Sequence, residues 1–116
     1  MAPSPTIDTE AVTVRRATRP DLLSIHRLET RVFDEPWSYS VFEEFLGEPA
    51  FLVADLDGRL LGYVVADRTP NNGRDLGHIK DLAVDPEAQR NGIGRLLLRG
   101  AVSRLLVEGV VRIKLE

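Results

Sequence analysis

The sequence predicts an α/β fold in which helices cover a mixed sheet. Two apolar, β-rich runs flank Asp57-Gly58, a pair that is typical of a tight turn between antiparallel strands. Residues 77–84 then have the pattern of a strand, residues 94–107 that of an amphipathic helix, and residues 110–116 that of another strand. A strand–helix–strand order favours a right-handed parallel crossover, so one sheet is expected to contain antiparallel and parallel pairs.

The first half of the chain predicts one strand and two helices. Residues 11–17 begin with alternating apolar and polar side chains, as a half-buried strand does. Thr18, three positions before Asp21, forms a helix-start signature, and Ser38 or Ser40 is expected to cap a shorter second helix after DEPWS. The side chains expected to face inward are Leu22, Ile25, Leu28 and Val32 in the first helix and Val41, Phe42, Phe45 and Leu46 in the second.

The predicted order is therefore strand–helix–helix–strand–strand–strand–helix–strand. Gly109 is expected to end the long helix, because glycine is favoured just past a helix C-terminus. Residues 1–10, MAPSPTIDTE, are expected to form a disordered tail, which leaves residues 11–116 as one domain. The tail contains two prolines and no apolar segment, so the sequence predicts neither a signal peptide nor a membrane anchor, and a cytoplasmic protein without a membrane partner.

The amino-acid composition argues against several classes of partner and functional site. The formal net charge of -3 argues against a nucleic-acid backbone as the main partner. The absence of cysteine excludes a disulfide scaffold, a thiolate metal site and a cysteine nucleophile. Only His26 and His78 could offer imidazole, too few for a typical zinc centre, so no metal is expected.

The segment from Gln89 to Gly94 is a glycine loop between a predicted strand and a predicted helix. It is not a Walker-type phosphate loop, because Gly94 is followed by Arg95 rather than by Lys and Ser or Thr. A dinucleotide-binding fingerprint needs a third glycine or alanine where this chain has Leu97. A turn that merely connects the two elements remains an alternative.

The remaining interpretation is an anion site at a helix N-terminus. A helix that begins near Gly92 offers unpaired amides and the positive end of its dipole. Glycine lets an anion approach that backbone, so main-chain groups can hold a pyrophosphate. Gln89, Arg90 and Arg95 would add side-chain donors around it.

Residues 82–98, LAVDPEAQRNGIGRLLL, resemble the acetyl-coenzyme A motif of the GNAT superfamily of N-acetyltransferases. The signature Gln/Arg-x-x-Gly-x-Gly/Ala corresponds here to Gln89, Gly92 and Gly94. FDEPWSYSVF, GHIKDLAV and GVVRIKLE further resemble the Phe-Pro-Trp-Ser segment, the fourth strand and the opening of the fifth strand of RimI-type and archaeal protein N-terminal acetyltransferases. The resemblance spans about residues 12–116 in matching element order.

This resemblance implies a GNAT-like acyl-CoA N-acyltransferase fold that transfers acetyl from acetyl-CoA to an amine, in the first place the N-terminal α-amine of a protein. It implies that the backbone of Leu82, Ala83 and Val84 pairs with the pantetheine arm, one amide polarising the thioester carbonyl. The amine would attack the thioester directly, without an acyl-enzyme. The residues that would wrap the pyrophosphate are Arg90, Asn91, Gly92, Ile93, Gly94 and Arg95, with Gln89 beside them.

Two carboxylates are candidates for the general base. A peptide α-amine has a pKa of about 7.7–8.0, so a base of modest strength suffices, directly or through water. Glu116 falls where RimI-like enzymes carry a catalytic glutamate, and a solvated chain end is the alternative. Glu35 lies in the loop that carries a working glutamate in archaeal relatives, and an exposed loop acid is the alternative. His78 is either catalytic or an ordinary strand-end histidine.

The acceptor site is expected to contain Trp37, Tyr39 and Asp81. The alternatives are that the two aromatic side chains pack at a helix–helix corner and that Asp81 faces solvent. Tyr63, on the hairpin, is expected to serve packing alone.

The sequence departs from the family after its fifth predicted strand, where the family continues with a helix and two strands. Those elements usually carry Asn-x-x-Ala-x-x-Leu-Tyr, whose tyrosine serves as general acid toward the departing thiolate. Without them, an exposed last strand is expected to pair with a second copy in a homodimer, since open edges template association. Poor solubility or weak activity of the 116-residue chain is expected for the same reason.

Two other functions stay open. One is a sibling enzyme that acetylates a small amine, for which Asp34, Glu35 and Asp81 could build an acidic pocket. The other is a truncated, non-catalytic module that binds coenzyme A or a protein partner.

Overall fold

The computed structural model describes residues 6–70, 72 and 74–115. Over these residues it forms a five-stranded sheet with strand order β1-β2-β3-β4-β5. The first four strands are antiparallel neighbours and β5 joins β4 in parallel, which confirms the predicted mixed sheet. The strands are β1 (Thr13–Arg16), β2 (Phe51–Leu56), β3 (Arg59–Thr69), β4 (Leu76–Val84) and β5 (Arg112–Leu115).

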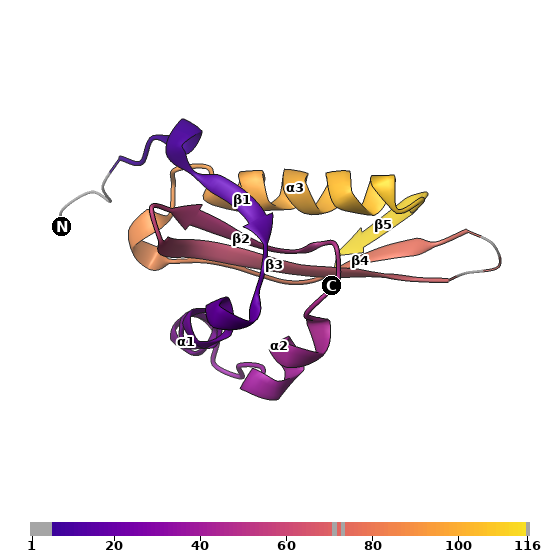
Figure 1. Cartoon of the computed structure of the whole chain (residues 1–116), viewed down its shortest axis with the longest axis horizontal. Coiled ribbons are helices and arrows are strands. Elements are labelled where there is room, and N and C mark those ends of the chain that lie inside the picture. The colour runs from indigo at the N-terminus through magenta and orange to yellow at the C-terminus, as the bar shows by residue number, and fades with distance from the viewer. Residues whose placement is uncertain (1–5, 71, 73, 116) are drawn as a thin grey trace.

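The helices lie on both faces of this sheet, as Figure 1 shows. The long helix α3 (Ile93–Val107) covers one face, and α1 (Leu22–Val32) and α2 (Tyr39–Phe45) cover the other. Each face has its own cluster of buried side chains. Leu97 of α3 is fully buried on the first face, and Phe42 of α2 is fully buried on the second.

Two turns form as the sequence predicts. Asp57 and Gly58 both have positive φ, 50° and 88°, which are the left-handed conformations that a tight hairpin turn requires. Gly109, with φ 88°, ends α3, and the amide of Val110 reaches back to the carbonyl of Leu105 at 3.1 Å. That contact closes the helix end in the manner of a glycine C-cap.

The start of α1 is held by a carboxylate, as Thr18 and Asp21 predict. Asp21 accepts the Thr18 amide at 2.7 Å and the Thr18 hydroxyl at 2.9 Å. The Arg15 guanidinium adds a two-pronged contact at 2.8 and 2.9 Å and, with these bonds, lowers the pKa of Asp21 to about 2. A 3-10 turn, Arg19–Asp21, precedes the helix itself.

Local details differ from the expectations at three places. Within the expected tail, residues 1–5 lie outside the described residues, and Thr9–Ala11 form a 3-10 turn, so β1 begins at Thr13. Ser38 occupies the position before α2, but its hydroxyl contacts that of Ser40 at 3.1 Å instead of capping an amide. The last strand begins at Arg112 rather than at the expected Val110. No helix in the described part of the chain is long and apolar enough to cross a membrane.

Candidate functional site

The fourth strand is paired along its whole length with β3 but only along its first part with β5. The parallel register joins Leu76 to Arg112 and ends at Ile79 with Leu115. At the same level the register with β3 slips, because Val65 pairs with Asp81 whereas Ala66 pairs with Ile79, which leaves Lys80 as an extra residue. Such a bulge bends a strand. Residues 80–84 therefore present an edge that no described residue of β5 covers.

The backbone groups of this edge can be assigned from the hydrogen bonds. The amide of Asp85 donates to the carbonyl of Leu61 at 2.8 Å, just beyond the paired residues of β3 and β4. Amides alternate between the two sides of a strand, so Ala83 bonds toward Tyr63 of β3, while Leu82 and Val84 point to the open side. Of the three residues expected to bind pantetheine, the structure brings only these last two to the edge.

The glycine loop, residues 89–94, comes after this edge of β4 in the chain. Arg90 and Gly92 have positive φ, 68° and 80°, and a Cβ on Gly92 would meet no other atom within 4 Å. The first described helical bond of α3 runs from the Leu96 amide to the Gly92 carbonyl at 3.1 Å, so the amides between them belong to the unpaired first turn. An anion can therefore approach that turn closely, and the loop fits a pyrophosphate.

The side chains of the loop have different surroundings. Gln89, Arg90 and Arg95 are exposed, whereas Ile93 is buried and can contribute only its backbone. Asn91 holds the loop together: its amide nitrogen donates to the carbonyls of Ala88 and Gln89, each at 3.2 Å. Its oxygen accepts the amide of Ile7 at 2.9 Å, which ties the N-terminal segment to the loop.

A cleft of about 360 Å³ opens where β4 leaves β5. Its walls come from the loop after α1, from both strands and from α3, so four parts of the fold meet there. The lining residues are Phe33, Ile79, Lys80, Asp81, Leu82, Leu98 and Leu115.

Behind the cleft lies a buried polar cluster that sequence reasoning missed. Glu29 of α1 is only 2% exposed, and it accepts the hydroxyl of Tyr63 and, at 2.7 Å, the amide of Trp37. Asp81 adjoins it, accepting the Leu82 amide at 3.0 Å with one oxygen, while its other oxygen is buried without a hydrogen-bond partner among the described residues. Burial, and after it the Glu29 carboxyl, raises the pKa of Asp81 to about 8. Burial, again followed by Glu29, raises the pKa of Tyr63 far above its usual value.

The sequence does contain a signal for this cluster. Glu29 lies seven residues after Leu22 and four after Ile25, so it falls on the apolar face of α1. A charged residue on such a face is buried, and buried carboxylates need partners. Tyr63, expected to serve packing alone, is one of those partners.

Three of the remaining candidates lie between α1 and the first residue of α2. Trp37 stacks on Phe45 with ring centres 5.7 Å apart, so its ring is part of the helix–helix corner. Tyr39 is 36% exposed and meets the ring of His26 edge-on. Glu35 is exposed in the loop between α1 and α2. Glu116 lies outside the described residues.

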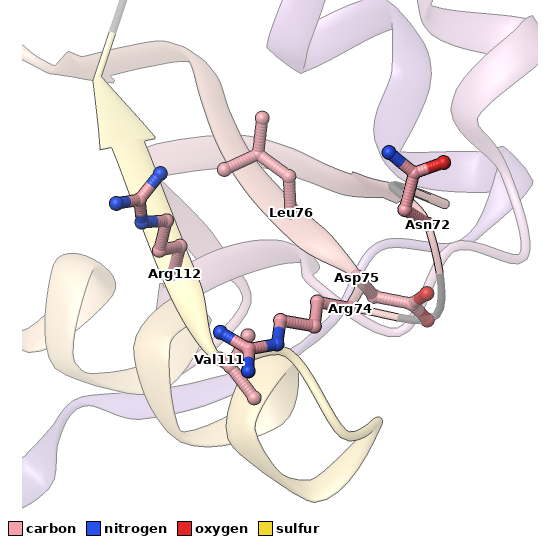
Figure 2. Close-up of a pocket in the computed structure, with 6 residues that line it drawn as sticks. All are labelled: Asn72, Arg74, Asp75, Leu76, Val111 and Arg112. Atoms are coloured by element: carbon pink, nitrogen blue, oxygen red, sulfur yellow. The ribbon is translucent and has the colours of Figure 1, made fainter.

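A second cavity, of about 450 Å³, lies at the opposite end of β4 (Figure 2). Its lining includes Arg74 and Asp75 before the strand and Arg112 at the start of β5. Leu76, the first residue of β4, lines it too, and the strand rises about 26 Å from there to Val84. This cavity is therefore separate from the glycine loop.

In the described ranges, no group of three or more His, Asp or Glu side chains is placed to hold a metal ion.

Together these features define an α/β domain with an open strand edge that leads to a helix end whose first-turn amides are unpaired. Residues 19–116 match the family described as the acetyltransferase (GNAT) family, and the chain belongs to it. This confirms the family and the fold that the sequence predicts.

Individual relatives agree with this assignment. The N-alpha-acetyltransferase RimI of Mycobacterium tuberculosis is 36% identical over 98 residues, which cover 81% of this chain and 62% of the relative. The crystal structure of Ard1 from Thermoplasma volcanium superposes with a TM-score of 0.81 at 21% identity, covering 90% of this chain and 70% of the other. Arabidopsis thaliana Naa50, solved with the bisubstrate analogue CoA-Ac-MVNAL, gives 0.77 at 17% identity, covering 90% and 71%.

The chain is shorter than these proteins. It spans between 54% and 63% of the length of the first curated relatives that it matches.

Proposed function

We propose that this chain forms the donor-binding part of an N-acetyltransferase that moves acetyl from acetyl-CoA to the N-terminal α-amine of a protein. The observation that carries the proposal is that three features follow one another: the edge of β4 at residues 80–84 that β5 leaves uncovered, the cleft beside it and the unpaired helix turn after Gly92. The names of the relatives support the same activity, since RimI is an N-alpha-acetyltransferase and Naa50 was solved with a CoA–peptide analogue.

The donor would bind along the edge of β4. The amides of Leu82 and Val84 point to the open side. A pantetheine arm laid there would pair with Val84 as an added strand does, and with Leu82 once the Leu82 amide leaves Asp81, to which it now donates. The amides of Ile93, Gly94 and Arg95 would hold the pyrophosphate, with the exposed side chains of Gln89, Arg90 and Arg95 around it. Asn91 would contribute indirectly, because its side chain stabilises the conformation of the loop through hydrogen bonds to the loop backbone.

The acceptor would enter past the loop between α1 and α2. Phe33 and Asp81 line the cleft there. The backbone amide of Trp37 donates a hydrogen bond to the carboxylate of Glu29, which anchors the loop. The incoming amine would lie near Glu35, Tyr39 and Glu116. A carboxylate, Glu116 or Glu35, would take the first proton of the ammonium group, directly or through water.

A matched pair of glycine variants tests donor binding. Gly92 and Gly109 stand at the two ends of α3, both at positive φ, and a Cβ would meet no atom within 4 Å at either. G92A and G109A should each lose roughly 1–2 kcal/mol of stability through left-handed strain. Only G92A should also lose coenzyme A affinity, at least tenfold by calorimetry, because its methyl group occupies the anion's approach. Equal affinities in both variants would contradict the proposal.

The acceptor class is tested in the same preparations by mass spectrometry. The chain is incubated with acetyl-CoA and, separately, with short peptides, a polyamine and an aminoglycoside. We expect acetyl groups on peptide α-amines, and G92A should show less of the product than G109A. Transfer only to the small amines would assign the sibling activity, and coenzyme binding without transfer would assign a binding module.

A cytoplasmic location and a homodimer through β5 stay predictions, and sedimentation of the chain tests the latter.

A further inference from the structure

The N-terminal segment, residues 6–12, contacts the glycine loop. The Ile7 amide donates to the side-chain oxygen of Asn91 at 2.9 Å, although 84 positions separate the two residues. In Figure 1 the segment, in indigo, lies beside the loop that leads into α3. Residues 19–116 match the acetyltransferase (GNAT) family, so this contact joins the loop to a part of the chain that precedes the family match.

A hydrogen-bonded turn gives this segment a conformation of its own. The side chain of Asp8 accepts the Glu10 amide at 3.0 Å, and the carbonyl of Asp8 accepts the Ala11 amide at 3.0 Å. The Val12 amide then donates to the carbonyl of Thr9 at 3.2 Å. These bonds are local, so the direction in which the chain presents the Ile7 amide is set by the segment itself.

Apolar contacts hold the segment against the α3 side of the sheet. Ile7 and Val12 are half-buried and pack on the apolar cluster under α3. Val14 of β1 lies close to the middle of this helix, because a Cβ on Gly100 would be 3.1 Å from the Cγ1 atom of Val14. The chain before β2 is therefore fixed to the body of α3 at Val14 and to the loop before α3 at Ile7.

The glycine loop needs such support because its backbone is strained. Arg90, directly before Asn91, has φ 68°, and the other described non-glycine residues with positive φ are Asp57 and Asn72. Aspartate and asparagine adopt this left-handed conformation more readily than arginine does. A strained backbone persists only where its surroundings hold it. Asn91 supplies bonds to two loop carbonyls at 3.2 Å, and Ile7 holds the side chain of Asn91.

We propose that the N-terminal segment is a positioning element of the donor site, which acts through Asn91 to hold the glycine loop in its coenzyme-binding conformation. This inference rests on the proposed function. While Ile7 donates to Asn91, the carboxamide stays on the loop carbonyls and the amides after Gly92 stay available to the pyrophosphate. Loss of the Ile7 donor would let the loop relax toward less strained conformations that bind the pyrophosphate less tightly. The segment acts on the loop rather than on the reacting atoms, so it should change donor affinity and not the chemical step.

A pair of variants in the 116-residue chain, I7P and I7A, isolates the Ile7 donor. Both lose the same side chain, but only proline also loses the N–H group. The KM for acetyl-CoA and the Kd of coenzyme A should be about three- to tenfold higher in I7P than in I7A, as expected for the loss of one hydrogen bond. The two variants should agree within about twofold in kcat and in the KM for peptide. Equal coenzyme A affinities, or a KM for peptide that rises by the same factor as that for acetyl-CoA, would overturn the inference.

Amide hydrogen exchange in the unmodified chain gives a test that does not depend on the folding of a variant. Coupling between two contacts is reciprocal, so saturating coenzyme A should slow exchange of the Ile7 amide by the same factor, about three- to tenfold. The Glu48 amide is the control, because it donates to the Phe45 carbonyl at 3.0 Å beyond α2 and should not respond. If the chain binds coenzyme A and exchange at Ile7 does not slow, the inference is wrong, even where I7P fails to fold.

These measurements also separate the inference from the proposed function. If the wild-type chain binds coenzyme A while I7P and I7A agree and exchange at Ile7 stays unchanged, the positioning role fails and the proposed function stands. If calorimetry finds no binding of coenzyme A to the wild-type chain, the proposed function fails and the positioning role fails with it.

Discussion

The two faces of the sheet are covered by different kinds of buried side chain. The face under α3 is closed by aliphatic side chains such as Leu52, Val64 and Leu97, each fully buried. The face under α1 and α2 is also closed, yet Glu29 and Tyr63 are fully or almost fully buried within it. The core on the first face is therefore apolar throughout, whereas the core on the second face contains ionisable side chains. Chemistry is expected where the core is polar and borders the cleft.

The largest effect is expected on the apolar face. Leu97→Ala removes a fully buried side chain that packs against the β3 backbone near Gly62, and it should cost about 2–5 kcal/mol of unfolding free energy. Leu106→Ala on the same helix is the control, because Leu106 is 58% exposed and its loss should cost about 0.5 kcal/mol or less. Chemical denaturation measures both. Equal losses would mean that α3 is not closed against the sheet in this way.

A smaller effect is expected on the polar face. Tyr63→Phe leaves one oxygen of buried Glu29 without its donor and should cost about 1–3 kcal/mol. Tyr39→Phe is the matched control, since that ring is 36% exposed, and we expect it to change the unfolding free energy by about 0.5 kcal/mol or less. If the two variants unfold alike, the hydroxyl of Tyr63 does not support Glu29.

Much of the fold could be predicted because its signals are local. The hairpin at Asp57-Gly58, the end of α3 at Gly109 and the start of α1 at Asp21 each depend on a few neighbouring residues. Their conformations follow from the φ angles that glycine and aspartate allow and from short-range hydrogen bonds. The glycine loop is local in the same sense, which is why Gly92 could be selected from sequence.

The site could be predicted only in part because it depends on register. Which of Leu82, Ala83 and Val84 faces the open edge is decided by the pairing with β3, and the bulge at Lys80 has no clear signal in the sequence. The pairing of Glu29 with Tyr63 joins residues 34 positions apart. The sequence showed a charge on an apolar helix face but could not show its partner.

An amide NMR titration with coenzyme A tests the central claim, that the donor lies along the open part of β4 and on the first turn of α3. The account predicts that the resonances of Leu82 and of residues 93–95 shift strongly, while Ala83, bonded toward β3, shifts less. Shifts confined to the residues around the cavity of Figure 2, such as Arg74 and Arg112, would contradict it, as would no shift at Leu82.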